Sequence, residues 1–444
     1  MLRLTEIFRG ESPARLLARG SLAGFAILGA GAGLTFLSEV VIARNLGVEN
    51  YGLFAMVMAW LQVLVMVVLL GSNQALLRFV PVYVSSMNWS LLRGLLRQCW
   101  RGSLLLGLIV FSLVTFSLVL AGESVPSEVR LAFLIGMAAL PLYALSAQRQ
   151  AVLRGLHYIV SALAPENIVR PMLLMLLVMA LGWWKGFPVT AASGLAINGL
   201  AVAVAFLLGL YWQQRALPGE ARICEPEFRS REWLHVALPL FLIAGMQLLI
   251  SRMDIILLGA ITGREPAGIY TAASRIADLL VFALAAANAV VAPMIAGLYA
   301  RDDMAGLQRI LTLLAKGLLL FTLPLAALVM FFGSSILSLF GEGYVAGYLP
   351  LLILVCSQAV NSLCGPVGFL LAMTGHQMQS LRILALVTVL NIVLNLVLIP
   401  SFGMVGAAVA TAITVVLWNL LMLRFVRGHM GIDSSVLVLF RKQS

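Results

Sequence analysis

Nine charged residues lie inside long apolar stretches of the sequence, where a charge is costly. They are five arginines and four acids: Arg78, Arg149, Arg170, Arg252, Arg275, Glu39, Glu166, Asp254 and Asp278. A charge at the centre of a bilayer costs about 2.5–3.5 kcal/mol on insertion scales, so it needs a partner, a ligand or water. The forked guanidinium of arginine suits phosphate oxygens. We therefore expect the arginines to bind a phosphate-bearing anion, and the acids to bind a coupling cation or orient the arginines.

Some of these charges have a local structural explanation. Glu166 and Arg170 are four residues apart, and Arg275 and Asp278 are three apart. Residues at these spacings are neighbours on one helix face, so each pair can neutralise itself there. Such pairing competes with a role in binding.

The other embedded charges lack such a neighbour. Arg78 and Arg149 lie near predicted span ends, where a long side chain can extend to the membrane surface. Arg252 and Asp254 are two residues apart and point to different faces, so each needs a partner on another helix or on a ligand. Glu39 is in the same position, and for these three residues we favour a functional role.

Polar amides form a second group inside the apolar stretches. Asn391 and Asn395 share one helix face, and Gln358 and Asn361 are three residues apart. Amides can line a path for sugars, or they can join helices by hydrogen bonds. The sequence leaves both interpretations open.

The elements that carry these residues are membrane spans. Hydrophobic residues make up 62% of the 444 residues and charged residues only 11%, whereas soluble domains carry about 25% charged residues. Apolar runs long enough to cross a bilayer recur along the whole chain. They predict an all-α polytopic membrane protein of about twelve spans, bent most strongly at Gly365-Pro366. The spans are 21–43, 51–80, 102–121, 130–153, 158–182, 188–212, 234–261, 267–299, 308–332, 348–373, 380–400 and 403–426.

Lysine and arginine are distributed unevenly between alternate loops. One set of loops, which includes both tails, holds most of them, and the other holds only Arg44, Arg130, Lys185 and Arg264. Basic loops stay in the cytoplasm, so an even number of spans with both termini cytoplasmic is expected. The net charge of +11 is explained in the same way, by contact with anionic lipid, and not by nucleic acid. Residues 1–20 carry mixed charge, which is unlike a cleavable signal and allows a short interfacial helix.

The sequence also repeats itself at nearly constant distance. Residues 47–54 and 263–270 both follow the pattern G-x-E-x-x-G-apolar-aromatic, 216 residues apart, and Gly155-Leu156-His157 is echoed by Gly375-His376-Gln377. Such repeats predict two lobes of parallel topology. We expect a six-helix lobe at 21–212, a basic cytoplasmic linker at 213–232, a second six-helix lobe at 233–426 and a cytoplasmic tail at 427–444, with a central cavity enclosed by the lobes.

The sequence carries no catalytic signature. It has no nucleophile elbow, no nucleotide-binding loop and no zinc-protease motif, and its four cysteines have no metal or redox spacing. We therefore expect a transporter and not an enzyme, with no metal site and no cofactor. An ion gradient is the simplest energy source.

Several segments resemble those of a known family. They are ARNLG (43–47), YGLF (51–54), RMDIILLG (252–259), GIYTAASR (268–275), NAVVAP (288–293), GP (365–366) and MTGHQ (373–377). Together and in this order they are similar to the polysaccharide-biosynthesis flippases, which translocate O-antigen and other lipid-linked oligosaccharides. This family belongs to the multidrug/oligosaccharidyl-lipid/polysaccharide exporter superfamily.

The resemblance implies a substrate and a location. Such proteins move a polyprenyl-pyrophosphate-linked glycan, a precursor of lipopolysaccharide or another surface polysaccharide, across the inner membrane by alternating access. The implied partners are the lipid-linked oligosaccharide, membrane lipids, a coupling cation (H⁺ or Na⁺), and a polysaccharide polymerase or glycosyltransferases.

Two other functions compete with this interpretation. A cation-coupled multidrug exporter of the same superfamily should favour carboxylates in its cavity, whereas this chain has at least as many embedded arginines as acids. A membrane glycosyltransferase or ligase would need a sizeable outside loop with catalytic groups, and the predicted outside loops are short.

Overall fold

The computed structural model describes residues 13–183 and 189–439, and every regular element in this part of the chain is a helix. The expected all-α fold is confirmed. Helix α2 begins at Pro13, so most of the predicted interfacial helix at 1–20 lies outside the described residues.

Helix α2 (Pro13–Leu69) is the first of the series. The others are α3 (Ser72–Ser85), α4 (Trp89–Leu120), α5 (Ser127–Ala138), α6 (Leu140–Gly155), α7 (Ile159–Ala164), α8 (Arg170–Trp183), α9 (Ala191–Ala216), α10 (Glu220–Ile223), α11 (Ser230–Ile261), α12 (Arg264–Ala300), α13 (Met304–Ser338), α14 (Tyr348–Cys364), α15 (Val367–Met373) and α16 (Gln377–Met430), with short 3₁₀ or π turns between some of them.

Nine stretches of the described residues are long and apolar enough to cross a membrane. Two of them are far longer than one span: Ala26–Leu69 has 44 residues and Gln377–Met430 has 54. Each contains one non-helical residue, Gly47 and Gly403 respectively, close to the places where the sequence separates two spans. With each of these counted as two spans, and with the 37-residue α12, each of the twelve predicted spans is mostly helical within the described residues, and the span predicted at 51–80 is broken between α2 and α3.

Several spans are interrupted as well as bent. The predicted kink at Gly365-Pro366 is confirmed, because α14 ends at Cys364, α15 begins at Val367, and Gly365 has a φ of 78°. A further break, within the span predicted at 51–80, separates α2 from α3 at Leu70 and Gly71, with φ angles of 42° and 77°. A positive φ suits glycine and strains leucine.

The helices form two compact units. Unit 1 contains the described residues of Met1–Ser38, Leu64–Pro188 and Ala192–Phe241; unit 2 contains Glu39–Val63, Val189–Ala191 and the described residues of Leu242–Ser444. Helices α2 and α11 therefore contribute residues to both units. The lobes expected at 21–212 and 233–426 follow the sequence repeat and stay a prediction.

Unit 1 has its main apolar core where α3, α4 and α6 pack together. Leu76, Leu92 and Val152 are fully buried there. Trp233 of α11 closes the core and donates its indole hydrogen to the hydroxyl of Tyr83 at 2.8 Å.

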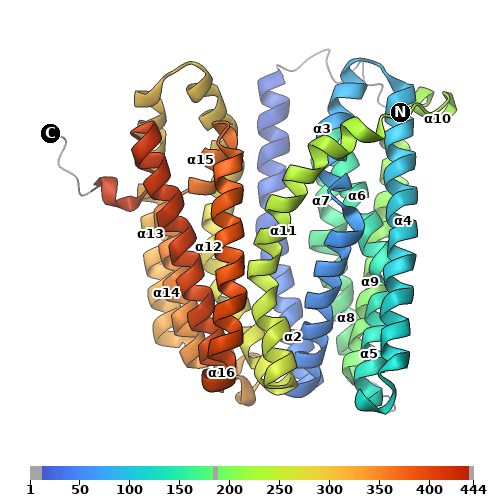
Figure 1. The fold of residues 1–444 in the computed structure, drawn as a ribbon, viewed down its shortest axis with the longest axis vertical. Helices are drawn as coiled ribbons and strands as arrows, with labels where there is room; N and C mark the ends of the chain where they lie inside the picture. The colour runs from blue at the N-terminus through green and yellow to red at the C-terminus, as the bar shows by residue number, and fades with distance from the viewer. Residues whose placement is uncertain (1–12, 184–188, 440–444) are drawn as a thin grey trace. The chain divides into compact units, whose positions relative to one another are not determined.

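Unit 2 is built around α14, which packs against α12, α13 and α16 (Figure 1). The chain after α16 is part of this core: Ile432 and Ser434 are buried, and Ser434 donates to the carbonyl of Cys364 at 2.9 Å. The start of the predicted C-terminal tail is therefore packed onto the break between α14 and α15.

The repeated G-x-E-x-x-G segments meet inside unit 2. The first glycines of the two copies, Gly47 and Gly263, share an extended backbone with positive φ (73° and 102°) that favours glycine. The last glycines face each other: a Cβ on Gly52 would overlap the carbonyl oxygen of Arg264, and one on Gly268 would lie 2.5 Å from that of Val48. Since Val48 and Arg264 are also equivalent in the repeat, the contact is symmetric.

We predict that Gly52→Ala weakens unit 2. The added methyl must push two helix backbones apart, and such overpacking costs about 1–3 kcal/mol or more. Thermal unfolding of the purified protein in one detergent should give a lower midpoint than the unsubstituted chain.

Gly33→Ala is the matched control. Gly33 lies in the same helix, and a Cβ there would meet nothing within 4 Å. Alanine is favoured over glycine in a helix by about 0.5–1 kcal/mol, so this midpoint should not fall. Equal midpoints for Gly52→Ala and Gly33→Ala would show that the glycine contact is not tight.

Candidate functional site

The embedded charges gather in two polar clusters, one in each unit. The cluster in unit 2 begins with an ion pair between α12 and α2, in which Arg275 Nη2 lies 3.4 Å from Glu39 Oε1. The second carboxylate oxygen of Glu39 accepts a 2.8 Å hydrogen bond from the buried hydroxyl of Tyr51. Arg275 therefore pairs with another helix and not with Asp278, as the local explanation had allowed.

Arg252 of α11 has no carboxylate within 4 Å in the described part of the chain. Its Nε donates to the side-chain oxygen of Gln62 at 2.7 Å, and its Nη1 donates to the carbonyl of Ser251 at 3.2 Å. The side chain is half-buried. Gln62 thus orients the guanidinium without neutralising it, and the positive charge remains available to a ligand.

Asp254 of the same helix is almost completely buried, at 3% exposure, and is held by hydroxyl and amide groups. Its Oδ2 accepts from Tyr270 at 2.6 Å and from Thr411 at 3.4 Å, and its Oδ1 accepts from the backbone of Ile255 at 2.8 Å. Among the described residues no basic group forms an ion pair with it. A buried carboxylate with hydrogen-bond donors and no ion pair is able to take up a proton or to bind a cation.

A ladder of amides and hydroxyls continues from Asp254 along α16. Thr414 lies one turn after Thr411 and accepts from Asn391 at 3.1 Å, while Asn395 donates to the side chain of Asn391 at 3.2 Å. Asn391 and Asn395 are fully buried. Their side-chain hydrogen bonds are made within the packed helices, to Thr414 and to each other. This arrangement favours helix–helix hydrogen bonding over a sugar path for this amide pair.

The cluster in unit 1 centres on Glu166, which lies between two arginines. Its Oε1 is 3.3 Å from Arg149 Nη2, and its Oε2 is 4.0 Å from Arg170 Nη1. Arg149 is fully buried, so it does not extend to a membrane surface. Gly209 makes room for it, because a Cβ there would overlap the guanidinium.

Glu166 lies in the short π-helical segment Pro165–Val169, which joins α7 to α8. Such segments are frequent at functional sites. Arg170 is the first residue of α8. The change from π-helix to α-helix between Glu166 and Arg170 therefore affects the directions in which these two side chains point.

Arg170 is held on more sides than any other arginine of the set. Its Nη2 donates to the hydroxyl of Tyr143 at 2.7 Å and to the side-chain oxygen of Asn198 at 3.1 Å. Its guanidinium carbon lies 5.0 Å from the centre of the Tyr143 ring, a cation–π distance. One-quarter of the side chain remains exposed, so Arg170 presents a fixed positive charge at the edge of a polar cluster.

Two predicted residues stand outside these networks. Arg78 on α3 and Asp278 on α12 are both exposed, and neither forms an ion pair with a described residue. For Arg78, this exposure agrees with the expected extension to the membrane surface.

Sequence reasoning missed the uncharged partners of the charges. Tyr51 and Tyr270 lie within the two repeated segments, so the repeat pattern contained a signal for them. Gln62, Tyr143 and Asn198 carry no comparable signal, because only the packing of distant helices brings them to the arginines.

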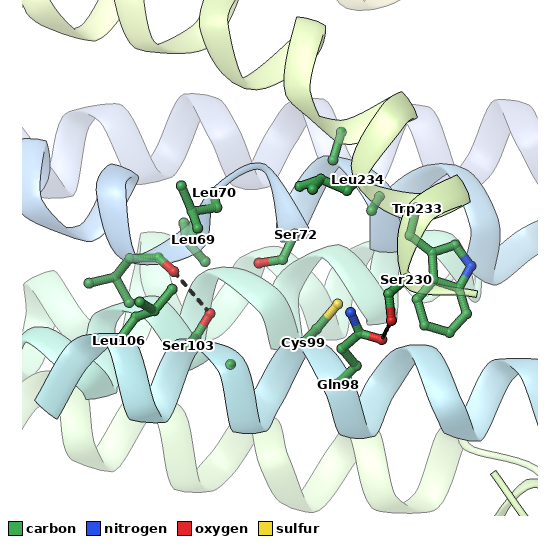
Figure 2. Close-up of a pocket in the computed structure, with 14 residues that line it drawn as sticks. Leu69, Leu70, Ser72, Gln98, Cys99, Ser103, Leu106, Ser230, Trp233 and Leu234 are labelled. Carbon is green, nitrogen blue, oxygen red and sulfur yellow. Dashed lines mark hydrogen bonds between the residues drawn. The ribbon is translucent and has the colours of Figure 1, made fainter. Parts of the chain in front are cut away.

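Unit 1 also contains an apolar cavity of about 170 Å³ beside the break between α2 and α3 (Figure 2). Leu69, Leu70 and Leu234 line it, with Ser72 and Ser103 as hydroxyl groups in its wall. None of the nine embedded charges faces this cavity. It is distinct from the charged clusters and too small for a glycan-bearing head group.

The chain matches one protein family and several curated relatives. The profile of the polysaccharide biosynthesis protein family matches residues 17–298. The chain is 23% identical over 403 residues to the probable low-salt glycan biosynthesis flippase Agl15 of Haloferax volcanii, which covers 90% of this chain and 81% of the relative. It is 31% identical to the probable flippase AglR of the same organism over 179 residues, 39% of this chain and 37% of the relative.

Solved structures with the same fold are transporters. An inward-facing multidrug resistance MATE family transporter of the MOP superfamily has a TM-score of 0.73 at 16% identity, covering 93% of this chain and 96% of that one. The lipid II flippase MurJ, in an inward closed conformation, has a TM-score of 0.69 at 17% identity, covering 92% and 87%. Identities this low establish the fold alone. The fold and the profile match together show that this multi-pass membrane protein belongs to the polysaccharide biosynthesis protein family.

Proposed function

We propose that the protein is a flippase for a polyprenyl-pyrophosphate-linked oligosaccharide, a precursor of a cell-surface polysaccharide such as O-antigen. It moves the head group across the cytoplasmic membrane by alternating access, driven by an H⁺ or Na⁺ gradient, with both termini in the cytoplasm. Family membership and the two relatives named as flippases support this proposal. Glycosyltransferases and a polymerase would act before and after it.

The observation that carries the proposal is the unneutralised guanidinium of Arg252. Holding a charge within a membrane span is expensive unless a ligand or water compensates it. Gln62 takes one donor of Arg252 at 2.7 Å and leaves others free, and a fork of donors fits the oxygens of a pyrophosphate. Arg275 serves as a second contact beside its pairing with Glu39, which orients it.

Arg170 is the corresponding contact in unit 1. Tyr143 and Asn198 fix its position, and Glu166 balances only part of the charge that Arg149 and Arg170 share. Arg149 is fully buried and holds Glu166, so it acts on the substrate through its neighbours. Arg78 remains a lesser candidate for the head group, at the membrane surface.

Asp254 is the candidate for coupling to the ion gradient. Its carboxylate lies among three helices, α11, α12 and α16, through Tyr270 and Thr411. A proton or a sodium ion bound to this carboxylate would neutralise an unpaired buried charge. Its binding would alter the hydrogen bonds to Tyr270 and Thr411 and therefore the packing of α11 against α12 and α16.

The multidrug exporter remains a second candidate because one observation favours it. Unit 2 holds three embedded acids (Glu39, Asp254 and Asp278) against two embedded arginines (Arg252 and Arg275). An exporter of cationic drugs would use the acids and gain from the loss of an arginine. The first prediction below separates the two functions.

We predict that Arg252→Ala lowers the rate of flipping of lipid-linked oligosaccharide by at least about tenfold, since one charge-assisted contact is worth about 1.5–3 kcal/mol. Arg252→Lys should restore only part of the rate, because lysine lacks the fork. The assay is the appearance of the glycan in the far leaflet of proteoliposomes, at equal protein content. Arg44→Ala, at an exposed position, should transport normally. Normal flipping by Arg252→Ala, with altered export of cationic dyes, would favour the drug exporter.

We predict that Glu166→Gln lowers the thermal stability of the protein more than Arg149→Met, although both substitutions break the same buried ion pair in unit 1. Glu166→Gln leaves the guanidinium of Arg149 buried without a counter-charge, and losing one partner of a buried pair costs about 3–5 kcal/mol. Arg149→Met should cost less, because Glu166 keeps Arg170 at 4.0 Å. Thermal unfolding in detergent measures both, and an equal or reversed order of midpoints would contradict the assignment.

Replacement of Asp254 should uncouple transport from the gradient. We expect Asp254→Asn to accept the bonds of Tyr270 and Thr411 and therefore to fold, but not to release a proton or bind sodium. In proteoliposomes with an imposed pH or sodium gradient, the gradient-driven rate should fall at least about tenfold, while exchange without a gradient persists. A variant that still accelerates in response to the gradient would exclude Asp254 as the coupling site.

A further inference from the structure

The apolar cavity of unit 1 lies where α4 changes from a basic helix to an uncharged one. Its wall on α4 extends from Gln98 to Leu106. Arg97 and Arg101 on this stretch are exposed, and the uncharged run of α4 begins at Gly102. Arginines of this kind mark the level of the lipid head groups, on the side that we propose to be cytoplasmic. The cavity therefore lies at the level where the head group of a membrane lipid meets its hydrocarbon chain.

The break between α2 and α3 forms another wall of the cavity. Leu70 lines the cavity with a φ of 42°, a strained conformation for leucine, and strain of this kind is concentrated at functional sites. The next residue, Gly71, packs closely on α11, because a Cβ there would lie 2.7 Å from the carbonyl oxygen of Ala237. Since Ala237 also lines the cavity, the break both brings α11 close and shapes the space beside it.

The polar groups in the wall are engaged in hydrogen bonds within unit 1. Ser72 and Ser103 accept from the buried amide of Gln148 at 2.7 and 2.6 Å. At the edge of the cavity, Ser230 donates to Gln98 Oε1 at 2.7 Å (Figure 2). The other lining residues are mostly aliphatic. The cavity therefore offers a ligand mainly hydrocarbon surface, which suits an apolar group.

The volume of the cavity limits the size of that group. It measures about 170 Å³, and a dry, aliphatic cavity of about 150 Å³ binds a benzene ring. The cavity thus has room for a compact group of about five or six carbon atoms. Leu70 and Leu234 at its edge are 42% and 53% exposed, so a longer chain can continue outside while one of its units lies within.

We propose that this cavity binds an isoprene unit of the polyprenyl carrier, close to its pyrophosphate. The inference rests on the proposed function and deepens it, because it assigns a site to the lipid part of the substrate. A chain that enters from the bilayer does not leave water, so the gain comes from van der Waals fit and not from the hydrophobic effect. The methyl branch of an isoprene unit fills a compact cavity, whereas a straight acyl chain has no branch to place there.

Gly102 provides a way to fill the cavity without disturbing the helix. It lines the cavity, and a Cβ there would meet nothing within 4 Å. Leucine is a better helix former than glycine, so Gly102→Leu should fold and occupy the space of the isoprene unit. Gly102→Ala fills less of this space and should have a smaller effect. Gly317→Leu on α13 is the matched control, because Gly317 is exposed, lies outside the cavity and has equally open space around it.

The test measures the binding of two compounds to the purified full-length protein in phosphatidylcholine nanodiscs. One is polyprenyl pyrophosphate, and the other is a straight-chain alkyl pyrophosphate with the same length of main chain. We expect the unsubstituted protein and Gly317→Leu to bind the polyprenyl compound about 3- to 10-fold more tightly, through the added van der Waals contacts. Gly102→Leu should abolish this preference, and Gly102→Ala should reduce it.

Thermal unfolding shows whether Gly102→Leu is folded. Its midpoint should equal or exceed that of the unsubstituted chain, because no atom lies in the way of the added Cβ. If the midpoint falls, the comparison rests on Gly102→Ala, whose single methyl group should still reduce the preference for the polyprenyl compound.

The outcomes separate the isoprene site from the flippase function. If the unsubstituted protein binds the two compounds equally, or if the folded Gly102 variants keep the full preference, the isoprene site is wrong and the flippase proposal stands. Arg252→Ala tests the proposed function in the same assay, since it should weaken both compounds alike. Normal binding of both by Arg252→Ala would contradict the pyrophosphate contact, whatever the result with Gly102→Leu. Loss of the preference in Gly102→Leu, with the preference intact in Gly317→Leu, supports the isoprene site.

Discussion

Within a bilayer, every polar group of the chain must find its partner in the protein or in a water-filled space. The embedded charges are compensated in two ways. Arg149 and Arg275 are neutralised by carboxylates from other segments, through Glu166 and Glu39. Arg252 and Asp254 are only hydrogen-bonded, by Gln62 in one case and by Tyr270 and Thr411 in the other. The ion pairs connect helices and neutralise the charges that they contain. The hydrogen bonds to uncharged groups leave the charge of Arg252 or Asp254 available to a ligand.

The same constraint shapes the backbone. Glycine with positive φ stands where α2 bends at Gly47, where α12 begins after Gly263, and at the break after α14 at Gly365. Each change of direction frees backbone groups, and the protein covers them. The break at Gly365, for example, is covered by the buried segment that follows α16, through the bond from Ser434 to the carbonyl of Cys364.

The nine embedded charges therefore have different proposed roles. Ion-paired residues set the positions of helices, hydrogen-bonded arginines present charge, and a buried carboxylate provides a site that can change its own charge. Such a set supports the proposal that the protein carries an anionic head group and uses a cation gradient.

The sequence by itself determined the helical class, the twelve spans, the kink at Gly365-Pro366 and the nine charges that deserve a role. These follow from local properties: hydrophobic length, glycine and proline, and the cost of charge in lipid. Local spacing left open a pairing of Arg275 with Asp278, whereas the ion pair of Arg275 is with Glu39, and it did not identify Gln62, Tyr143 or Asn198. Only the tertiary structure decided which charges are neutralised and which amides are buried. Those contacts join residues more than a hundred positions apart in some cases, such as Arg252 and Gln62, and they depend on how helices pack, which no local pattern encodes.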